Sequence, residues 1–103
     1  MYTYVIRSLL IATLLTSALP MAARDLNQDE ALRLRQQGVI LPLEEVLNIA
    51  RTRYPDLRLL DAELEEDDGS YIYEFELLTS GGVVRDMEID ARSGRILKDE
   101  EDD

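Results

Sequence analysis

The segment DDGSYIYEFELL, residues 67–78, joins a turn signal to a strand pattern. The pair Asp68-Gly69 suits a type I′ turn, because both central positions of that turn need positive φ, which aspartate tolerates and glycine adopts freely. Apolar and polar residues then alternate with the period of a β-strand. The apolar set is Tyr71, Tyr73, Phe75 and Leu77. The segment therefore predicts a hairpin whose second strand buries one face.

The segments on either side of this hairpin continue the alternation. RLLDAELEE, before the turn, places Leu60, Ala62 and Leu64 on one face. VVRDMEID, after a Gly-Gly pair, places Met87 and Ile89 on one face, and RILK offers a short final strand. Apolar residues on one face and polar residues on the other are typical of an antiparallel sheet with one face in solvent.

Two helices are expected before the strands. LPLEEVLNIARTRYP has apolar residues at helical spacing between Pro42, which suits a first helical turn, and Pro55, which ends the helix. The shorter LNQDEALRLRQQG begins with the capping-box pair Asn27 and Glu30 and ends at Gly38. We therefore predict an α+β fold, in which a helix packs on one face of a small antiparallel β-sheet and a short N-terminal helix precedes it.

The first 23 residues have the layout of a secretory signal peptide. Arg7 precedes an apolar run, which ends before Pro20 and the small residues Ala22 and Ala23. Cleavage after Ala22 and cleavage after Ala23 both fit the small-residue pattern imperfectly, so both positions stay open, as does an uncleaved membrane anchor. Export predicts a periplasmic or secreted protein.

Composition divides the rest of the chain. We expect a short helix and lead-in at 24–39, the helix-on-sheet domain at 40–98, and a disordered acidic tail at 99–103, which reads DEEDD.

The chain of 103 residues has 11 Lys and Arg against 22 Asp and Glu, a formal net charge of -11. Such a charge disfavours nucleic-acid binding, which needs cations to neutralise phosphates.

The residue types present exclude most catalytic sites. The sequence contains no His and no Cys, so the usual nucleophile–base pairs and thiolate metal sites are absent. Two carboxylates could cleave a glycosidic bond, but a domain this small seldom encloses the cleft that such chemistry needs. We therefore expect no enzyme activity, no catalytic residue and no cofactor.

ELEEDDGS, at the hairpin turn, has the acidity of a calcium loop but not its spacing. If Gly69 takes the place of the loop glycine, Leu64 and Phe75 fall where an EF-hand needs acidic ligands. A solvated hairpin tip is therefore the favoured interpretation. The weak candidates for binding a divalent cation are Glu65, Glu66, Asp67 and Asp68.

Three further features have both a structural and a functional interpretation. In IDARSGRIL, the Asp90 carboxylate can accept backbone N–H groups and Gly94 can adopt positive φ, so a tight structural turn is favoured over a ligand site. The aromatic stripe of residues 71–75 is favoured as core over a binding platform. Acids on the solvent face of the sheet could steer a basic partner. They are Glu74, Glu76, Asp86 and Glu88.

The order of these pieces resembles the PepSY domain over residues 40–98. LPLEEVLNIARTRYP, a strand, DDGSYIYEFELL and VRDMEIDARSGRIL follow one another as in that family. The most telling parts are Tyr73-Glu74 and Asp90-Ala91 followed by Ser93-Gly94. Pro42 departs from the family pattern, in which Ser or Thr often begins the helix.

The resemblance implies a non-catalytic module outside the cytoplasm that binds and regulates a protein partner. The implied partner is a peptidase, which the module inhibits, or the periplasmic domain of a sensor kinase in envelope signalling. The acidic surface leaves an alternative, a periplasmic binder of divalent cations or cationic peptides. Neither function involves nucleic acid or stable membrane insertion after signal cleavage.

Overall fold

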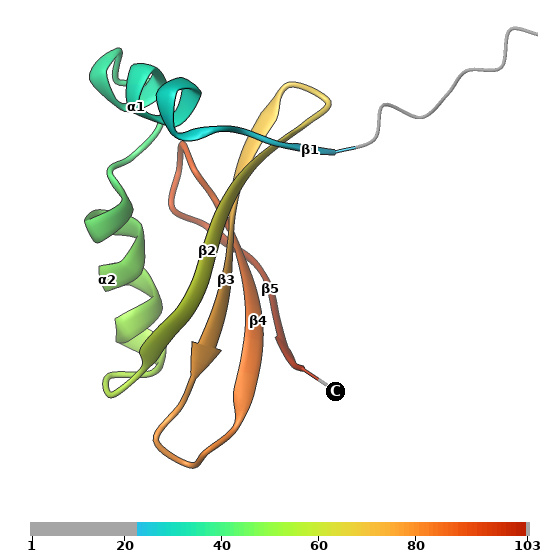
Figure 1. The fold of residues 1–103 in the computed structure, drawn as a ribbon. Helices are drawn as coiled ribbons and strands as arrows, with labels where there is room; N and C mark the ends of the chain where they lie inside the picture. Colours follow the sequence, from blue (N-terminus) through green and yellow to red (C-terminus); the bar gives the residue numbers. More distant parts are fainter. Residues whose placement is uncertain (1–22, 103) are drawn as a thin grey trace, which may run out of the picture.

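The computed structural model describes residues 23–102, which form a five-stranded antiparallel sheet with two helices on one side of it (Figure 1). The strands are β1 (Arg24–Asp25), β2 (Arg58–Asp67), β3 (Ser70–Leu78), β4 (Val84–Asp90) and β5 (Ile96–Glu101). The helices are α1 (Gln28–Gln36) and α2 (Leu43–Arg53), and neither is long and apolar enough to span a membrane. The strands cross the sheet in chain order. The predicted α+β fold is confirmed, while the predicted signal peptide lies, but for Ala23, outside the described residues.

Local signals place the ends of the elements. At the turn between β2 and β3, Asp68 and Gly69 have φ of 51° and 83°, as a type I′ turn requires. α1 begins with a capping box, in which the Asn27 side chain accepts the Glu30 N–H at 2.9 Å. α1 ends where Gly38 takes φ of 70°. These local predictions are confirmed.

The core lies between α2 and the inner face of the sheet. α2 contributes Val46, Leu47 and Ala50, and β3 and β4 contribute their aromatic and aliphatic residues. Tyr73 and Phe75 are 1% and 2% exposed and belong to the core, whereas Tyr71, the third member of the aromatic stripe, is partly buried and packs against it. Burial of large apolar side chains is the main stabilising term in a domain of this size.

Two irregularities in strand pairing turn apolar residues away from the core. The β2–β3 register shifts between Leu59 and Asp61, so that Leu59 packs against the core whereas Leu60 is 47% exposed. The prediction that Leu60 faces inward is therefore wrong, because a bulge reverses the alternation at this point. The β4–β5 register also shifts, and Leu97 is 46% exposed.

The prediction of a disordered tail at 99–103 is wrong for most of that segment. β5 runs to Glu101 and pairs with β4, and the N–H of Asp102 donates to the Val84 carbonyl at 2.8 Å. The physical reason is Asp99, whose carboxylate is held by arginines of α2 and β4. The domain therefore extends beyond its predicted end at residue 98.

Candidate functional site

The four acids of the predicted partner surface lie together on the sheet face that points away from α2. Glu74 and Glu76 alternate along β3 with its buried residues, and they pair with Glu88 and Asp86 of β4. All four side chains are partly exposed. The register thus gathers four carboxylates into one block on two neighbouring strands.

β2 adds two acids to this surface, and the alternation within β3 and β4 does not predict them. Asp61 lies opposite Glu76, and Glu63 lies opposite Glu74. The bulge after Leu59 sets this alignment, and a pairing register leaves no signal within a single strand. Six carboxylates form what we call the acidic face: Asp61, Glu63, Glu74, Glu76, Asp86 and Glu88.

The acidic face has little positive charge beside it. Lys98 of β5 lies opposite Glu88, with 3.8 Å between its Nζ and Oε2 of that glutamate. Elsewhere the register sets carboxylates directly opposite one another, an arrangement that destabilises a sheet. The acidic face therefore holds electrostatic repulsion that a bound cation would relieve.

One carboxylate beside the acidic face responds strongly to this repulsion. A hydrogen bond with Glu74, burial, and the charges of Glu74, Glu88 and Asp25 raise the pKa of Glu65 to about 7. Asp25, at the end of β1, completes a group of three carboxylates with Glu65 and Glu74, whose oxygens lie within 4.8 Å of one another. A second such group is Glu76, Asp86 and Asp102. Oxygen ligands of this kind suit a hard divalent cation.

The structure does not bring the four hairpin candidates for cation binding together. Strand alternation turns Glu65 toward Glu74, whereas Glu66 pairs with Arg24 at 3.0 Å. Asp67 ends β2, and Asp68 lies in the turn itself. Within residues 23–102, Glu65 is the one of the four that belongs to a carboxylate group.

Acidification is expected to stabilise the fold over the range in which Glu65 titrates. The pKa of Glu65 rises from 4.5 to about 7 on folding, so between these values the folded chain holds a proton that the unfolded chain has released. Stability therefore increases as the pH falls through this window. Thermal unfolding at about pH 8 and at about pH 5 measures the increase.

Glu65→Gln mimics the protonated side chain and should lose most of this pH dependence. Glu101→Gln, at the exposed end of β5, is the matched control and should keep it. The pKa values of Asp90 and Asp99 are lowered, so their contributions are lost only below about pH 4, outside the window. A Glu65→Gln variant with the pH dependence of the wild type would contradict the assignment to Glu65.

The segment from Asp90 to Gly94 forms a tight turn between β4 and β5. Asp90 Oδ1 accepts the N–H groups of Arg92 at 2.8 Å and of Ser93 at 2.9 Å. The bond from Ser93 is the largest influence on the pKa of Asp90, which is held below its ordinary value. Gly94 has φ of 78°, and Ala91 is fully buried. This is the geometry of a structural turn.

Gly94→Ala is expected to lower the free energy of unfolding by about 1–2 kcal/mol, because a residue with a Cβ is strained in the left-handed region. The new Cβ would also lie 2.6 Å from Cδ1 of Ile49 in α2. Chemical denaturation measures the loss. Adding Ile49→Val removes that methyl group and should restore only the steric part. Gly81→Ala meets open space and should change little; an equal loss there would count against this explanation.

The fold and its surface define a class of protein, a small helix-on-sheet module whose sequence lacks the His and Cys of common catalytic sites. Residues 40–100 match the PepSY family, described as "Peptidase propeptide and YPEB domain". The match covers α2 and nearly the whole of strands β2 to β5. The chain belongs to the PepSY family.

The chain is also similar to a protein of Bacillus subtilis (strain 168) named "Uncharacterized protein YkoJ". The two are 37% identical over 75 residues, which is 73% of this chain and 44% of the relative. The chain therefore spans less than half the length of that relative. No solved structure matches the chain.

Proposed function

We propose that this chain is a non-catalytic module that binds a protein partner outside the cytoplasm and regulates it. The observation that carries the proposal is the family match, which links the helix-on-sheet unit to peptidase propeptides. The lack of His and Cys in the sequence supports a role without catalysis. The partner is a peptidase, which the module inhibits, or the periplasmic domain of an envelope sensor. The module itself is periplasmic or secreted.

The acidic face supports a partner with a basic docking surface. Carboxylates set opposite one another give this side of the sheet a concentrated negative field. Such a field raises the rate at which a cationic partner associates, and salt weakens it over a Debye length of about 10 Å at 0.1 M. Partner binding is therefore expected to be salt-dependent.

Affinity capture from an envelope extract tests the proposal. The tagged exported protein should retain a specific extracytoplasmic protein at low salt and release it at high salt. Glu74→Gln with Glu76→Gln keeps the shape of the acidic face and removes two charges, so capture should weaken. Glu44→Gln with Glu45→Gln removes two exposed acids of α2 and is the matched control. Failure of the wild type to retain any specific partner would contradict the proposal.

A second candidate function is the binding of divalent cations, which the group of Asp25, Glu65 and Glu74 favours. Calorimetric titration with calcium measures this directly, and Glu74→Gln should abolish the heat of binding if the group is a site. A chelator during affinity capture separates the two functions. Capture that survives the chelator supports the leading proposal, and capture that needs calcium supports the second.

Export is expected to remove the first residues, so that the mature protein begins at Arg24 or Ala23. A cut after Ala23 leaves β1 intact, and in β1 the Arg24 guanidinium pairs with Glu30 at 3.1 Å and with Glu66 at 3.0 Å. N-terminal sequencing of protein from the extracytoplasmic fraction identifies the cut. An intact Met1 on exported protein would favour the uncleaved anchor.

A further inference from the structure

The sheet edge at β2 is only partly covered by β1. β1 pairs with Glu65 and Glu66, and the Leu26 N–H donates to the Leu64 carbonyl at 2.8 Å before the chain turns into α1 (Figure 1). Within the described part of the chain, no strand pairs with residues 58–63 on this side. An uncovered strand edge presents backbone groups that are free to pair with another chain.

Ala62 has backbone groups well placed to bind an added strand. Along a strand, every second residue directs its N–H and C=O to the same side. The Leu64 carbonyl points to the open edge, where it accepts the Leu26 N–H. The N–H and C=O of Ala62, two residues earlier, therefore point to the same edge. The Ala62 side chain packs beside the core. A strand added here would continue the line of β1 along the edge of the sheet.

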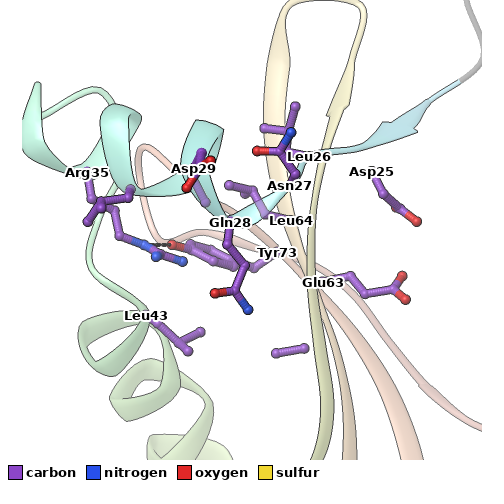
Figure 2. Close-up of a pocket in the computed structure, with 13 residues that line it drawn as sticks. Asp25, Leu26, Asn27, Gln28, Asp29, Arg35, Leu43, Glu63, Leu64 and Tyr73 are labelled. Carbon is purple, nitrogen blue, oxygen red and sulfur yellow. Dashed lines mark hydrogen bonds between the residues drawn. The ribbon is translucent and has the colours of Figure 1, made fainter.

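A hollow of about 790 Å³ opens on the inner side of this edge (Figure 2). Its apolar lining includes Leu32, Leu43, Ala62 and Leu64, which come from α1, α2 and β2. The Tyr73 hydroxyl accepts a hydrogen bond from Arg35 Nε at 3.1 Å within the lining, which ties α1 to the sheet. The hollow is large enough to take an apolar side chain from a docked segment.

The outer side of the same edge carries two acids, and none of the ion pairs within the described residues involves either of them. Asp61 and Glu63 flank Ala62 and are exposed. The pKa of Glu63 is raised, first by the charge of Asp25 and then by that of Asp61. A cation placed beside Asp61 and Glu63 would relieve this repulsion.

We propose that the open edge of β2 binds an extended segment of a partner protein as an added strand. The central side chain of the segment is apolar and enters the hollow opposite Ala62, while flanking Lys or Arg side chains face Asp61 and Glu63. Strand addition supplies main-chain hydrogen bonds, and side-chain pockets at alternate positions supply specificity. This inference rests on the proposed function and specifies the chemistry of the partner.

Two other pairings match this chemistry less well. A second copy of the chain, paired antiparallel about Ala62, would set Asp61 of one copy opposite Glu63 of the other, and like charges across strands are destabilising. The opposite edge of the sheet, at β5, alternates Lys98 with Glu100 on its outer side, so it offers a basic segment no continuous acidic row.

Titration of the exported protein with three synthetic peptides tests the proposal. The first, Lys-Leu-Lys-Thr-Thr-Thr, has the proposed pattern and, paired antiparallel as β1 is, lies opposite residues 63 to 58, short of the part of β2 that β1 and Leu26 already occupy. The second replaces both Lys residues by Glu, and the third replaces Leu by Ser. Nuclear magnetic resonance of isotope-labelled protein reports both affinity and position. The first peptide should bind at least about tenfold more tightly than the others. The largest amide shifts, and slowed exchange of the amide proton, should be at Ala62.

Two variants locate binding at β2. Ala62→Pro removes the outward N–H at a position where an edge strand tolerates proline, and it should abolish binding. Asp61→Lys with Glu63→Lys replaces like-charge pairs across the sheet by opposite charges, so the fold is retained, and this variant should prefer the Glu peptide. Glu100→Lys with Glu101→Lys makes the same change of charge at β5 and should leave binding unchanged.

Absence of binding to the wild type, or amide shifts centred on β5, overturns the proposal. A preference for the Lys peptide that survives charge reversal at β2 overturns it as well. Affinity capture of the partner distinguishes a failure of the strand-addition proposal from a failure of the proposed regulatory function. Capture that Ala62→Pro leaves unaffected overturns the docking mode but not the regulatory role. Peptide binding at β2 without any captured partner supports the docking surface and rejects the regulatory role.

Discussion

Phe75→Ala is expected to lower the free energy of unfolding by about 3–5 kcal/mol, the range found when a buried aromatic ring is removed. Phe75 is 2% exposed, and its ring centroid lies 5.9 Å from that of Tyr73. No small rearrangement can refill so large a space in a close-packed core. The loss is comparable with the whole stability of many small domains. Circular dichroism during chemical denaturation measures it.

Leu60→Ala is the matched control for this experiment. Leu60 belongs to β2 and is as apolar as a core residue, but the bulge leaves it 47% exposed. Its truncation should cost less than about 1 kcal/mol. If Leu60→Ala and Phe75→Ala lowered the free energy of unfolding equally, the placement of the bulge would be contradicted. If Phe75→Ala unfolded at the same denaturant concentration as the wild type, the helix–sheet core would be contradicted.

Asp99→Ala is expected to cost about 2–3 kcal/mol, because it removes several charge-assisted hydrogen bonds at once. The Asp99 carboxylate accepts from Arg85 Nε at 2.7 Å, from the Tyr54 hydroxyl at 2.7 Å and from Arg53 Nη1 at 3.0 Å. Burial opposes the ionised form, but these bonds outweigh it and hold the pKa of Asp99 below its ordinary value of 3.8. Through this carboxylate, β5 is joined to α2 and β4.

Glu101→Ala serves as the control, since Glu101 lies in the same strand and is exposed. Its loss should stay within about 0.5 kcal/mol. The contribution of Asp99 is present above pH 3.8 and is lost as the pH falls through the lower pKa of the folded chain. The deficit of Asp99→Ala should therefore shrink in strong acid. An Asp99→Ala variant as stable as the wild type at neutral pH would contradict the anchoring of β5.

The ends of helices and turns were predictable because their chemistry is local. The capping box at Asn27 and the positive φ of Gly69 and Gly94 each depend on residues a few positions apart, so one sequence contains the whole signal. The period-two alternation also identified the buried face of β3, since Tyr73 and Phe75 lie in a strand without a bulge.

Pairing between distant segments was not predictable in the same way. Alternation alone predicts that Leu60 faces inward, because it assumes an unbroken register, which the bulge interrupts. β1 has two residues and no pattern of its own. Asp99 lies in a segment that has the composition of an acidic tail. Its arginine partners, Arg53 and Arg85, lie 46 and 14 residues away in sequence, so the segment itself carries no sign of them.

The candidate site was likewise predictable only where it depends on a single strand. The acids of β3 and β4 followed from alternation, whereas the hollow beside β2 exists because the chain leaves that edge after Leu26 to form α1. The raised pKa of Glu65 likewise needs Asp25 and Glu74, which strand pairing brings to it from two other strands. Properties that arise from three strands at once have no signature in any one of them.

Photo-crosslinking in living cells tests whether the chain binds a partner along β2. A photoreactive amino acid in place of Glu63, at the open edge, is expected to form a discrete adduct with an extracytoplasmic protein. The same substitution at Glu101, at the other edge, should not form that adduct, and Ala62→Pro should remove it from the Glu63 position. If neither position gives an adduct, or if both give the same adducts with or without Ala62→Pro, a partner-binding module that works through β2 is contradicted.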